Sequence, residues 1–510
     1  MDNSANNKRI AKNTMALYFR MLFTMAVSLY TSRVILNTLG VVDYGIYNVV
    51  GGIVSMFTFI NGAMVTSTQR YLTYELGRGN MKKLQEVFST SIYVHIGISL
   101  AIVLLAETVG LWFFYEKMVI PVERMAAAMW VFQLSILTMV INVMSVPYNS
   151  AIVAHEKMSA FAIISVAEVV LKLLIVYMLV IGNFDKLKLF AVLSACLSLL
   201  IRFIYTQYSH RHFLETQCVF RPNLSLIKEM GQFAGWNIWG NMAAMFMGTG
   251  LNMLLNVFFG PVVNAARGIA VQVESAVAHF STNFLMAVNP QITKLYAQNN
   301  LKEMHTLVFR ASKFAYFLMF ALSLPIIMET KPILTLWLTI VPDHTVIFLR
   351  LLLVIVIIDA VARPLMTSAA ATGNVKKYQS VIGGILLSIV PIAYIVLKFG
   401  GSPASVYIVY LCVAIVAFIS RLLIIRPMIH LSLRQYTQYV VMRIFLVTVV
   451  SFLSILFVRA LLPANSLGTL LVCFFSIVIA LIASYALGLT TNERNFVRQK
   501  VTFVMHKLHH

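Results

Sequence analysis

The feature that most constrains this chain is a series of fourteen apolar stretches, each about twenty residues long. A helix rises ~1.5 Å per residue, so each stretch can cross a hydrocarbon layer about 30 Å thick. With 60% hydrophobic and 11% charged residues in 510, the chain has too little polar surface for a soluble protein. The sequence therefore predicts an all-α, polytopic membrane protein with about 14 transmembrane helices. The expected spans are 13–36, 43–66, 88–112, 122–145, 158–181, 187–207, 233–256, 265–288, 309–330, 346–370, 378–397, 404–425, 440–461 and 466–488.

The distribution of charge predicts the orientation of these helices. Lys and Arg number 39 against 18 Asp and Glu, and most of them fall in the segments on one side of the predicted membrane. Because short cytoplasmic loops carry an excess of Lys and Arg, both termini are expected in the cytoplasm. The basic segments are not interleaved with aromatic residues, so no nucleic-acid partner is expected. Because the polar N-terminus lacks a short apolar core and a small-residue cleavage site, no signal peptide is expected.

A weak internal repeat divides the chain. Residues 39–48 resemble residues 259–268, and residues 70–84 resemble residues 290–304, both at an offset of 220. Residues 146–161 resemble residues 363–378 at an offset of 217. Each repeat holds six helices, an even number, so both begin on the same side of the membrane. The sequence thus predicts two lobes related by a parallel pseudo-two-fold axis. The expected parts are an N-lobe at 1–207, a cytoplasmic linker at 208–232, a C-lobe at 233–430, and two extra helices with a cytoplasmic tail at 431–510.

Several charged residues lie inside the predicted spans, where each costs about 2.5–3.5 kcal/mol to insert. Such residues usually face a water-filled cavity or one another. We expect the basic ones to line a cavity between the lobes and to bind an anionic substrate, because the guanidinium fork matches phosphate and carboxylate groups. These candidate substrate-binding residues are Arg33, Arg267, Arg20, Lys172 and Arg363, and the accompanying carboxylates are Glu274, Asp359 and Glu168.

Structural interpretations of the same residues stay open. Glu168 with Lys172, and Asp359 with Arg363, have the i,i+4 spacing of ion pairs within a helix. Arg20 and Arg33 lie near helix ends, where a long side chain reaches the polar interface. The polar face that contains Arg267 and Glu274 could equally pack against a neighbouring helix.

The chain lacks the motifs of most enzymes and pumps. It has no GxxxxGK[ST] phosphate loop, no GxSxG or HExxH motif, and no spaced cluster of Cys and His. We therefore expect no enzymatic activity, no ATP hydrolysis, no cofactor and no metal site.

Two segments carry a family resemblance. Arg33-Val-Ile-Leu, then Leu39-Gly40 and Asp43-Tyr44-Gly45-Ile46-Tyr47, resembles the first-helix signature of bacterial polysaccharide transport proteins. GPVVNAARGIAVQV at 260–273 and AVNPQITKLYA at 287–297 are similar to the same proteins, particularly to members of lipopolysaccharide biosynthesis. These are the O-antigen and capsule flippases of the multidrug/oligosaccharidyl-lipid/polysaccharide exporter superfamily. The resemblance covers nearly the whole chain.

The resemblance implies a flippase of the bacterial inner membrane that moves an undecaprenyl-pyrophosphate-linked oligosaccharide to the periplasmic leaflet by alternating access. Arg33 and Arg267 fall in matching motifs and are expected to receive the anionic substrate. Related members use ion gradients or the membrane potential, and where a cation gradient is used, Glu168, Glu274 or Asp359 is expected to bind H+ or Na+. The implied partners are the lipid-linked oligosaccharide, membrane lipid and the polysaccharide assembly machinery.

Two alternatives remain. The first is a cation-coupled multidrug exporter of the same superfamily, whose cavity selects cationic apolar compounds with acidic and aromatic groups. The second is a membrane polymerase or ligase acting on the same lipid carrier. Enzymes of that kind generally have a sizeable periplasmic loop, and none is predicted here.

Overall fold

The structure is a computed structural model that describes residues 3–55, 58–116, 120–179, 184–217, 223–338, 341–463, 465–491 and 493–495. Helices account for nearly all of these residues, and no strand occurs among them. Within the described part of the chain, eleven helical segments are long and apolar enough to cross a membrane, and they coincide with eleven of the predicted spans. The other three predicted spans fall on α1, α2 and α9, which carry more polar residues. The predicted polytopic all-α membrane protein is therefore confirmed.

The chain forms two compact units. Unit 1 comprises Met1–Met242, Met286–Asn300 and Gly373–Gln379, and unit 2 comprises Ala243–Leu285, Leu301–Thr372 and Ser380–His510. The predicted lobe boundaries stay a prediction, because units grouped by contact need not match units of a repeat. The helices of unit 1 are α1 (Asn3–Ser55), α2 (Thr58–Arg78), α3 (Met81–Leu105), α4 (Leu111–Glu116), α5 (Met125–Ala154), α6 (Met158–Met178), α7 (Lys186–His212) and the first part of α8 (Leu224–Phe259).

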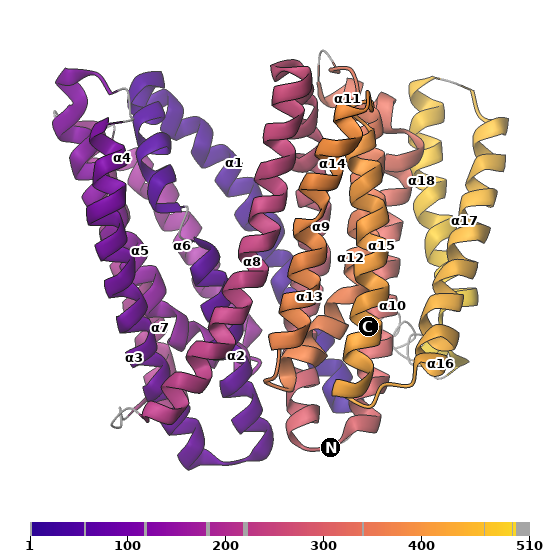
Figure 1. The fold of residues 1–510 in the computed structure, drawn as a ribbon, viewed down its shortest axis with the longest axis horizontal. Helices are drawn as coiled ribbons and strands as arrows, with labels where there is room; N and C mark the ends of the chain where they lie inside the picture. Colours follow the sequence, from indigo (N-terminus) through magenta and orange to yellow (C-terminus); the bar gives the residue numbers. More distant parts are fainter. Residues whose placement is uncertain are drawn as a thin grey trace, which may run out of the picture. The chain divides into compact units, whose positions relative to one another are not determined.

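Unit 2 begins in the second part of α8, at Ala243, whereas the end of α9 (Pro261–Ala297) and the start of α13 (Lys376–Leu387) belong to unit 1. The helices of unit 2 are most of α9, then α10 (Leu301–Met328), α11 (Thr330–Trp337), α12 (Thr345–Ala371), most of α13, α14 (Ile389–Lys398), α15 (Ser405–Met428), α16 (Leu433–Tyr436), α17 (Met442–Leu461) and α18 (Ser466–Ala483). Within this unit α10 packs on α12 and α18, and α12 packs on α15, while α17 and α18 run together along one edge (Figure 1).

One predicted boundary is wrong. The sequence predicted a break between two spans at residues 37–42, but α1 continues through this stretch to Ser55. The segment Leu39-Gly40-Val41-Val42 contains no proline, and a single glycine costs a helix only about 1 kcal/mol, so nothing in it forces the helix to end. Conversely, the predicted span 378–397 is two helices, α13 and α14. Pro391 has no N–H to donate to the preceding turn, which accounts for the interruption near Ser388.

The turn between α2 and α3 has the same backbone as the turn between α9 and α10. Gly79 and Asn299, which are 220 residues apart, both adopt left-handed backbone angles, with φ of 70° and 56°. In each turn the next residue donates its N–H to a carbonyl five residues back, from Asn80 to Glu75 and from Asn300 to Leu295. Asn80 also caps α3 by accepting from the Lys83 N–H. This likeness agrees with the predicted repeat at this offset.

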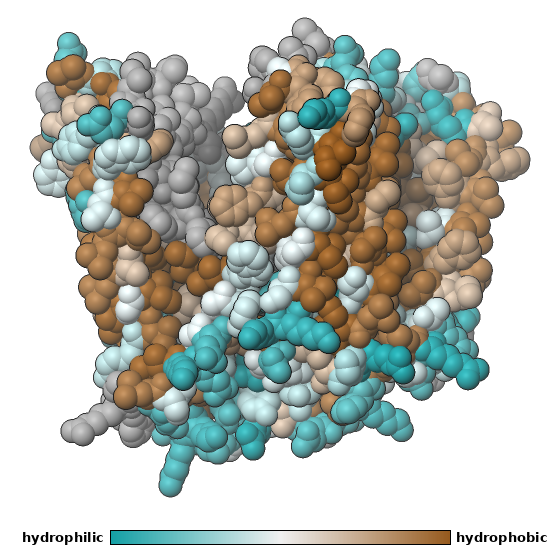
Figure 2. Space-filling view, viewed as in Figure 1, coloured by the Kyte–Doolittle hydropathy of each residue, from teal (hydrophilic) through white to brown (hydrophobic). Residues whose placement is uncertain are grey.

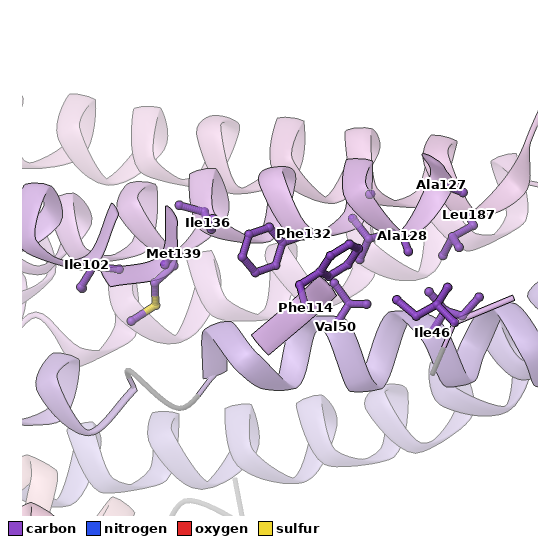
Figure 3. Packing of buried hydrophobic residues seen from close by; sticks show 14 of the residues in the cluster. Ile46, Val50, Ile102, Phe114, Ala127, Ala128, Phe132, Ile136, Met139 and Leu187 are labelled. Carbon is purple, nitrogen blue, oxygen red and sulfur yellow. The ribbon is translucent and has the colours of Figure 1, made fainter. Parts of the chain in front are cut away.

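An apolar cluster in unit 1 joins α1, α3, α4, α5 and the start of α7. Phe114 and Phe132 lie at its centre with ring centroids 5.4 Å apart, and Val50 and Ala128 pack beside them (Figure 3). Gly110, at the end of a wide helical turn before α4, leaves room for the Phe132 ring, because a Cβ there would lie 3.2 Å from it. Burial of these side chains fixes how α5 lies against its neighbours.

One arginine joins three elements at the end of unit 1 where α5 begins. Arg124 donates to Asp43 of α1 over 2.8 and 2.5 Å, and to Asp185 over 3.0 and 3.1 Å. Asp185 also caps α7 through the N–H groups of Leu187 and Lys188. The hydrogen bonds from Arg124 and these N–H groups outweigh partial burial, so they hold the pKa of Asp185 below its usual range.

The surface of unit 2 fits a lipid environment. Figure 2 shows hydrophobic side chains along the middle of α14, α15 and α17, with hydrophilic side chains gathered toward one end of these helices. Large apolar side chains such as Ile395, Leu423 and Phe457 are more than half exposed. Soluble monomers rarely expose contiguous apolar surface of this kind, whereas the hydrocarbon region of a membrane covers it.

Candidate functional site

Arg267 lies in unit 2 on α9 and is held by α8. Its Nη2 donates to the Gly248 carbonyl over 2.8 Å, and its Nη1 donates to the Asn252 side-chain oxygen over 3.2 Å. Gly248 and Asn252 are four residues apart, so they share one face of α8. The positive charge of Arg267 is therefore oriented by neutral acceptors rather than cancelled by a carboxylate.

Two further polar groups lie beside these contacts. The Nε of Arg267 is buried without a standard hydrogen bond among the described residues, and the same holds for the hydroxyl of Tyr407. Tyr407 is 1% exposed and sits on α15, close enough to Arg267 to interact with it electrostatically. Buried polar groups in proteins are nearly always hydrogen-bonded, so the Arg267 Nε, which donates to no acceptor among the described residues, suits an anionic acceptor.

The acidic residues of unit 2 pair differently from the helical-spacing interpretation. Asp359 accepts from Arg421 of α15 over 3.0 Å, whereas Arg363 turns away and donates to the Thr282 hydroxyl of α9 over 3.2 Å. The i,i+4 ion pair between Asp359 and Arg363 is therefore absent from the structure. Spacing within one helix cannot anticipate a competing partner on another helix, and Arg421 is that partner. The Arg421 side chain is 6% exposed, so leaving its buried charge without the Asp359 partner would be costly.

Glu274 completes the group. Ser275 donates to its carboxylate over 3.4 Å, and both Arg363 and Asp359 lie near enough to act on it electrostatically. Tyr410 of α15 lies near both Glu274 and Asp359. We call the following residues the unit 2 polar site: Arg267, Glu274, Asp359, Arg363, Tyr407, Tyr410 and Arg421.

Sequence reasoning missed three members of this site. Tyr407, Tyr410 and Arg421 lie on one face of α15, at spacings of three, four, three and four residues that also include Ala414 and Ala417. That period is the signature of a buried helical face. Arg421 lies inside the predicted span 404–425 but was not among the candidate binding residues, because a count of charges does not test which face of a helix a charge occupies.

The candidates in unit 1 are not gathered in the same way. Arg20 of α1 stacks on the Phe161 ring, 4.8 Å from its centroid, with Tyr205 of α7 nearby. Lys172 and Glu168 are both exposed on α6. Arg33 belongs to α1, but its side chain lies outside the described residues. The structure thus groups Arg267, Glu274, Asp359 and Arg363, and it places Arg20, Lys172 and Glu168 in the other unit.

Within the described ranges, no three His, Cys, Asp or Glu side chains are close enough together to hold a metal ion. The described cysteines, Cys196, Cys412 and Cys473, are free thiols.

Comparison with known proteins identifies the fold. No family model and no curated protein sequence matches the chain. Among solved structures, an outward-facing multidrug resistance MATE family transporter of the MOP superfamily matches with a TM-score of 0.70 and 13% identity, over 84% of this chain and 98% of that one. A MATE protein in a bent conformation matches with a TM-score of 0.70 and 15% identity, over 84% and 98%.

A third solved structure has a title that concerns its binding pocket. It is a MOP superfamily transporter from Pyrococcus furiosus, described as having a binding pocket of reversed polarity that suggests a different function. It matches with a TM-score of 0.69 and 14% identity, over 82% of this chain and 96% of that one. The chain therefore has the fold of MOP superfamily transporters, and at this identity the likeness concerns the fold alone.

Proposed function

We propose that this protein is a flippase that moves an undecaprenyl-pyrophosphate-linked oligosaccharide from the cytoplasmic to the periplasmic leaflet of a bacterial inner membrane. The observation that carries the proposal is Arg267, a cation at membrane depth that is oriented by Gly248 and Asn252, lies beside the Tyr407 hydroxyl, and has a buried Nε without an acceptor among the described residues. A pyrophosphate supplies the acceptors that this arrangement lacks. The fold supports transport, and the resemblance of residues 260–273 to polysaccharide transport proteins supports the substrate class.

The proposal includes a direction and partners. Alternating access of the two predicted lobes carries the sugar across, with both termini in the cytoplasm. The substrate is handed on to polysaccharide assembly machinery at the periplasmic face. Arg33, Arg20 and Lys172 stay proposed contacts for the anionic headgroup or acidic sugars along the path.

The test is a leaflet-specific translocation assay. The purified protein is reconstituted in vesicles loaded with a lipid-pyrophosphate-linked oligosaccharide, and an impermeant glycosidase reports which leaflet holds the sugar. We expect vesicles with the protein to redistribute the sugar well above the rate of protein-free vesicles. The flippase proposal is refuted if vesicles with the protein translocate the sugar no faster than protein-free vesicles. It is also refuted if they translocate it no faster than vesicles that contain an unrelated membrane protein.

A second candidate is a cation-coupled multidrug exporter, which the carboxylates of the unit 2 polar site favour. The Asp359 side chain is 43% exposed despite its contact with Arg421, so an incoming cation can reach it. Loading the same vesicles with a cationic dye separates the candidates. Dye expulsion without sugar translocation would assign the exporter function instead.

Coupling to a cation gradient makes a further prediction. We propose that Glu274 and Asp359, rather than Glu168, bind the coupling H+ or Na+, because these two carboxylates lie together in one site. With an imposed pH or Na+ gradient, Glu274→Gln should lose the gradient-driven increase in translocation and keep the basal rate. Glu123→Gln, an exposed carboxylate outside the site, is the matched control. An unchanged gradient response in Glu274→Gln would exclude Glu274 as the coupling residue.

A further inference from the structure

A buried ion pair in unit 1 joins two distant parts of the chain. Glu156 lies in the turn between α5 and α6, with a left-handed φ of 59°, and is 3% exposed. Its carboxylate accepts from Lys294 Nζ of α9 over 2.6 Å and also from the Gln291 side-chain amide. Its carbonyl accepts from the side chain of Asn13 in α1 over 3.0 Å. This turn therefore holds the last turns of α9 by charge as well as by hydrogen bonds.

A second turn makes a matching contact without a carboxylate. Gly373, between α12 and α13, has a φ of 80°, and a Cβ there would lie 2.5 Å from Nη2 of Arg70 in α2. The Arg70 guanidinium sits over the rings of Tyr71 and Tyr74, 4.4 and 4.8 Å from their centroids. Only glycine lets the arginine approach this turn so closely. The contact is therefore made by a stacked cation against bare backbone.

The predicted repeat relates these two contacts. The offset of 217 aligns Glu156 with Gly373, and both positions are left-handed turns. The offset of 220 aligns Gly77 of α2 with Ala297 of α9, and a Cβ on Gly77 would lie 2.9 Å from the Ala297 Cβ. Equivalent helix ends from the two repeats thus meet each other, and each turn grips the helix end of the other repeat. An apolar cluster of Leu17, Val153, Met158 and Ala287 backs the same contacts.

From these contacts we propose that the turns at Glu156 and Gly373 form a latch at the predicted cytoplasmic end. The latch holds segments 286–300 and 373–379 of the second repeat against the first repeat. The latch must release before a substrate can enter from that side. This inference rests on the proposed transport function. One arm, Glu156 with Lys294 and Gln291, is ionic, and the other, Arg70 on Gly373, is not. The ionic arm therefore sets the strength of the latch, because a buried charge left unpaired is costly.

The first experiment needs no substrate. In a background with the native cysteines replaced by Ser, Thr293→Cys places a near-isosteric thiol on the latched end of α9, where Thr293 is 6% exposed. We expect Glu156→Gln and Lys294→Ala each to raise the rate of maleimide labelling at this thiol by about tenfold or more, because a charge-assisted hydrogen bond is lost. Lys302→Ala, an exposed lysine on the next helix, should leave the rate unchanged.

The exchange of charges separates a latch from a general loss of folding. Glu156→Lys combined with Lys294→Glu should restore slow labelling, at least in part, while each single change labels fast. Labelling that stays slow in both Glu156→Gln and Lys294→Ala would overturn the ionic arm. Fast labelling that the combined variant does not reduce at all would also overturn it.

The second experiment locks the latch with a cross-link and measures transport. Tyr74 and Tyr296 lie across the contact, with ring centroids 6.4 Å apart. Tyr74→Cys with Tyr296→Cys, bridged by a short reducible thiol cross-linker, should stop sugar translocation, and reduction should restore it. Treating either single-cysteine variant with the same reagent should not change the translocation rate of that variant. If the cross-linked protein translocates sugar as fast as the same protein after the cross-linker is cleaved by reduction, the latch proposal is overturned. If the parent protein itself translocates no sugar, the flippase proposal fails, and the labelling experiment still decides whether the latch exists.

Discussion

Replacing Arg267 with alanine is expected to slow sugar translocation by about tenfold to a hundredfold while the protein still inserts and folds. A hydrogen bond to a charged group contributes about 1.5–3 kcal/mol, and each 1.4 kcal/mol corresponds to a factor of ten. The neighbours of Arg267 in unit 2 are neutral, namely Gly248, Asn252 and Tyr407, so its removal strands no opposite charge. The measurement is the initial rate of glycosidase-reported translocation, normalised to the amount of folded protein in the vesicles.

Two variants sharpen this prediction. Arg267→Lys keeps the charge but loses the planar fork, so it should recover part of the rate. Arg350→Ala removes an arginine of α12 whose Nε donates to the Thr330 hydroxyl over 3.1 Å, away from the unit 2 polar site, and should transport normally. If Arg267→Ala translocates as fast as the parent protein, the assignment of Arg267 to the substrate is wrong, whatever the protein carries.

The length of the apolar stretches predicted the helices well, because crossing a membrane requires a fixed length of continuous hydrophobic helix. The same rule failed at residues 37–42, since hydropathy does not show whether a short apolar connection bends or continues. Pairing was harder to predict. The spacing of Asp359 and Arg363 describes neighbours within one helix, but Arg421 reaches Asp359 from α15. Only the periodic face of α15 carried a signal for that contact.

The latch also shows what a weak repeat can predict. Alignment at two offsets paired Glu156 with Gly373 and Gly77 with Ala297, and the structure gives the first pair the same left-handed turn and the second pair a direct contact. The sequence could not predict that Lys294 would pair with Glu156, since the two are far apart along the chain. The residues aligned with them in the other repeat are also uncharged. Repeats predict backbone, whereas side-chain partners depend on the chemistry of each copy.

The second large effect, a loss of folding stability, is expected at the end of unit 2 where the chain leaves α18. Lys313 of α10 is 1% exposed and donates to Glu493 over 2.7 Å, and Arg310 lies 3.5 Å from the same carboxylate. Glu493 and Thr490 also bond each other's backbone N–H groups, which is a capping box at the start of a helical turn. This short segment is thereby anchored on α10 by a buried charge pair.

Removing one member of this pair should cost about 3–5 kcal/mol, because the other charge stays buried without its partner. Glu493→Gln and Lys313→Met should each lower the unfolding temperature in detergent, whereas the combined variant should recover most of the loss. Asp343→Asn, an exposed carboxylate, should have no such effect. Single changes as stable as the parent protein, or a combined variant no better than either, would show that the pair does not stabilise unit 2.

The same pair predicts how stability depends on pH. Burial alone would raise the pKa of Glu493, but the hydrogen bonds from Lys313 and from the Thr490 N–H outweigh it and hold the pKa below its ordinary value of 4.5. A carboxyl whose pKa is lower when folded stabilises the protein above its unfolded pKa and loses that contribution as the pH falls through the folded value. The stability difference between the parent protein and Glu493→Gln should therefore be constant near neutral pH and narrow only below pH 4.5. A difference that narrows instead as the pH rises above neutral would contradict this assignment, because it would place the titrating group elsewhere.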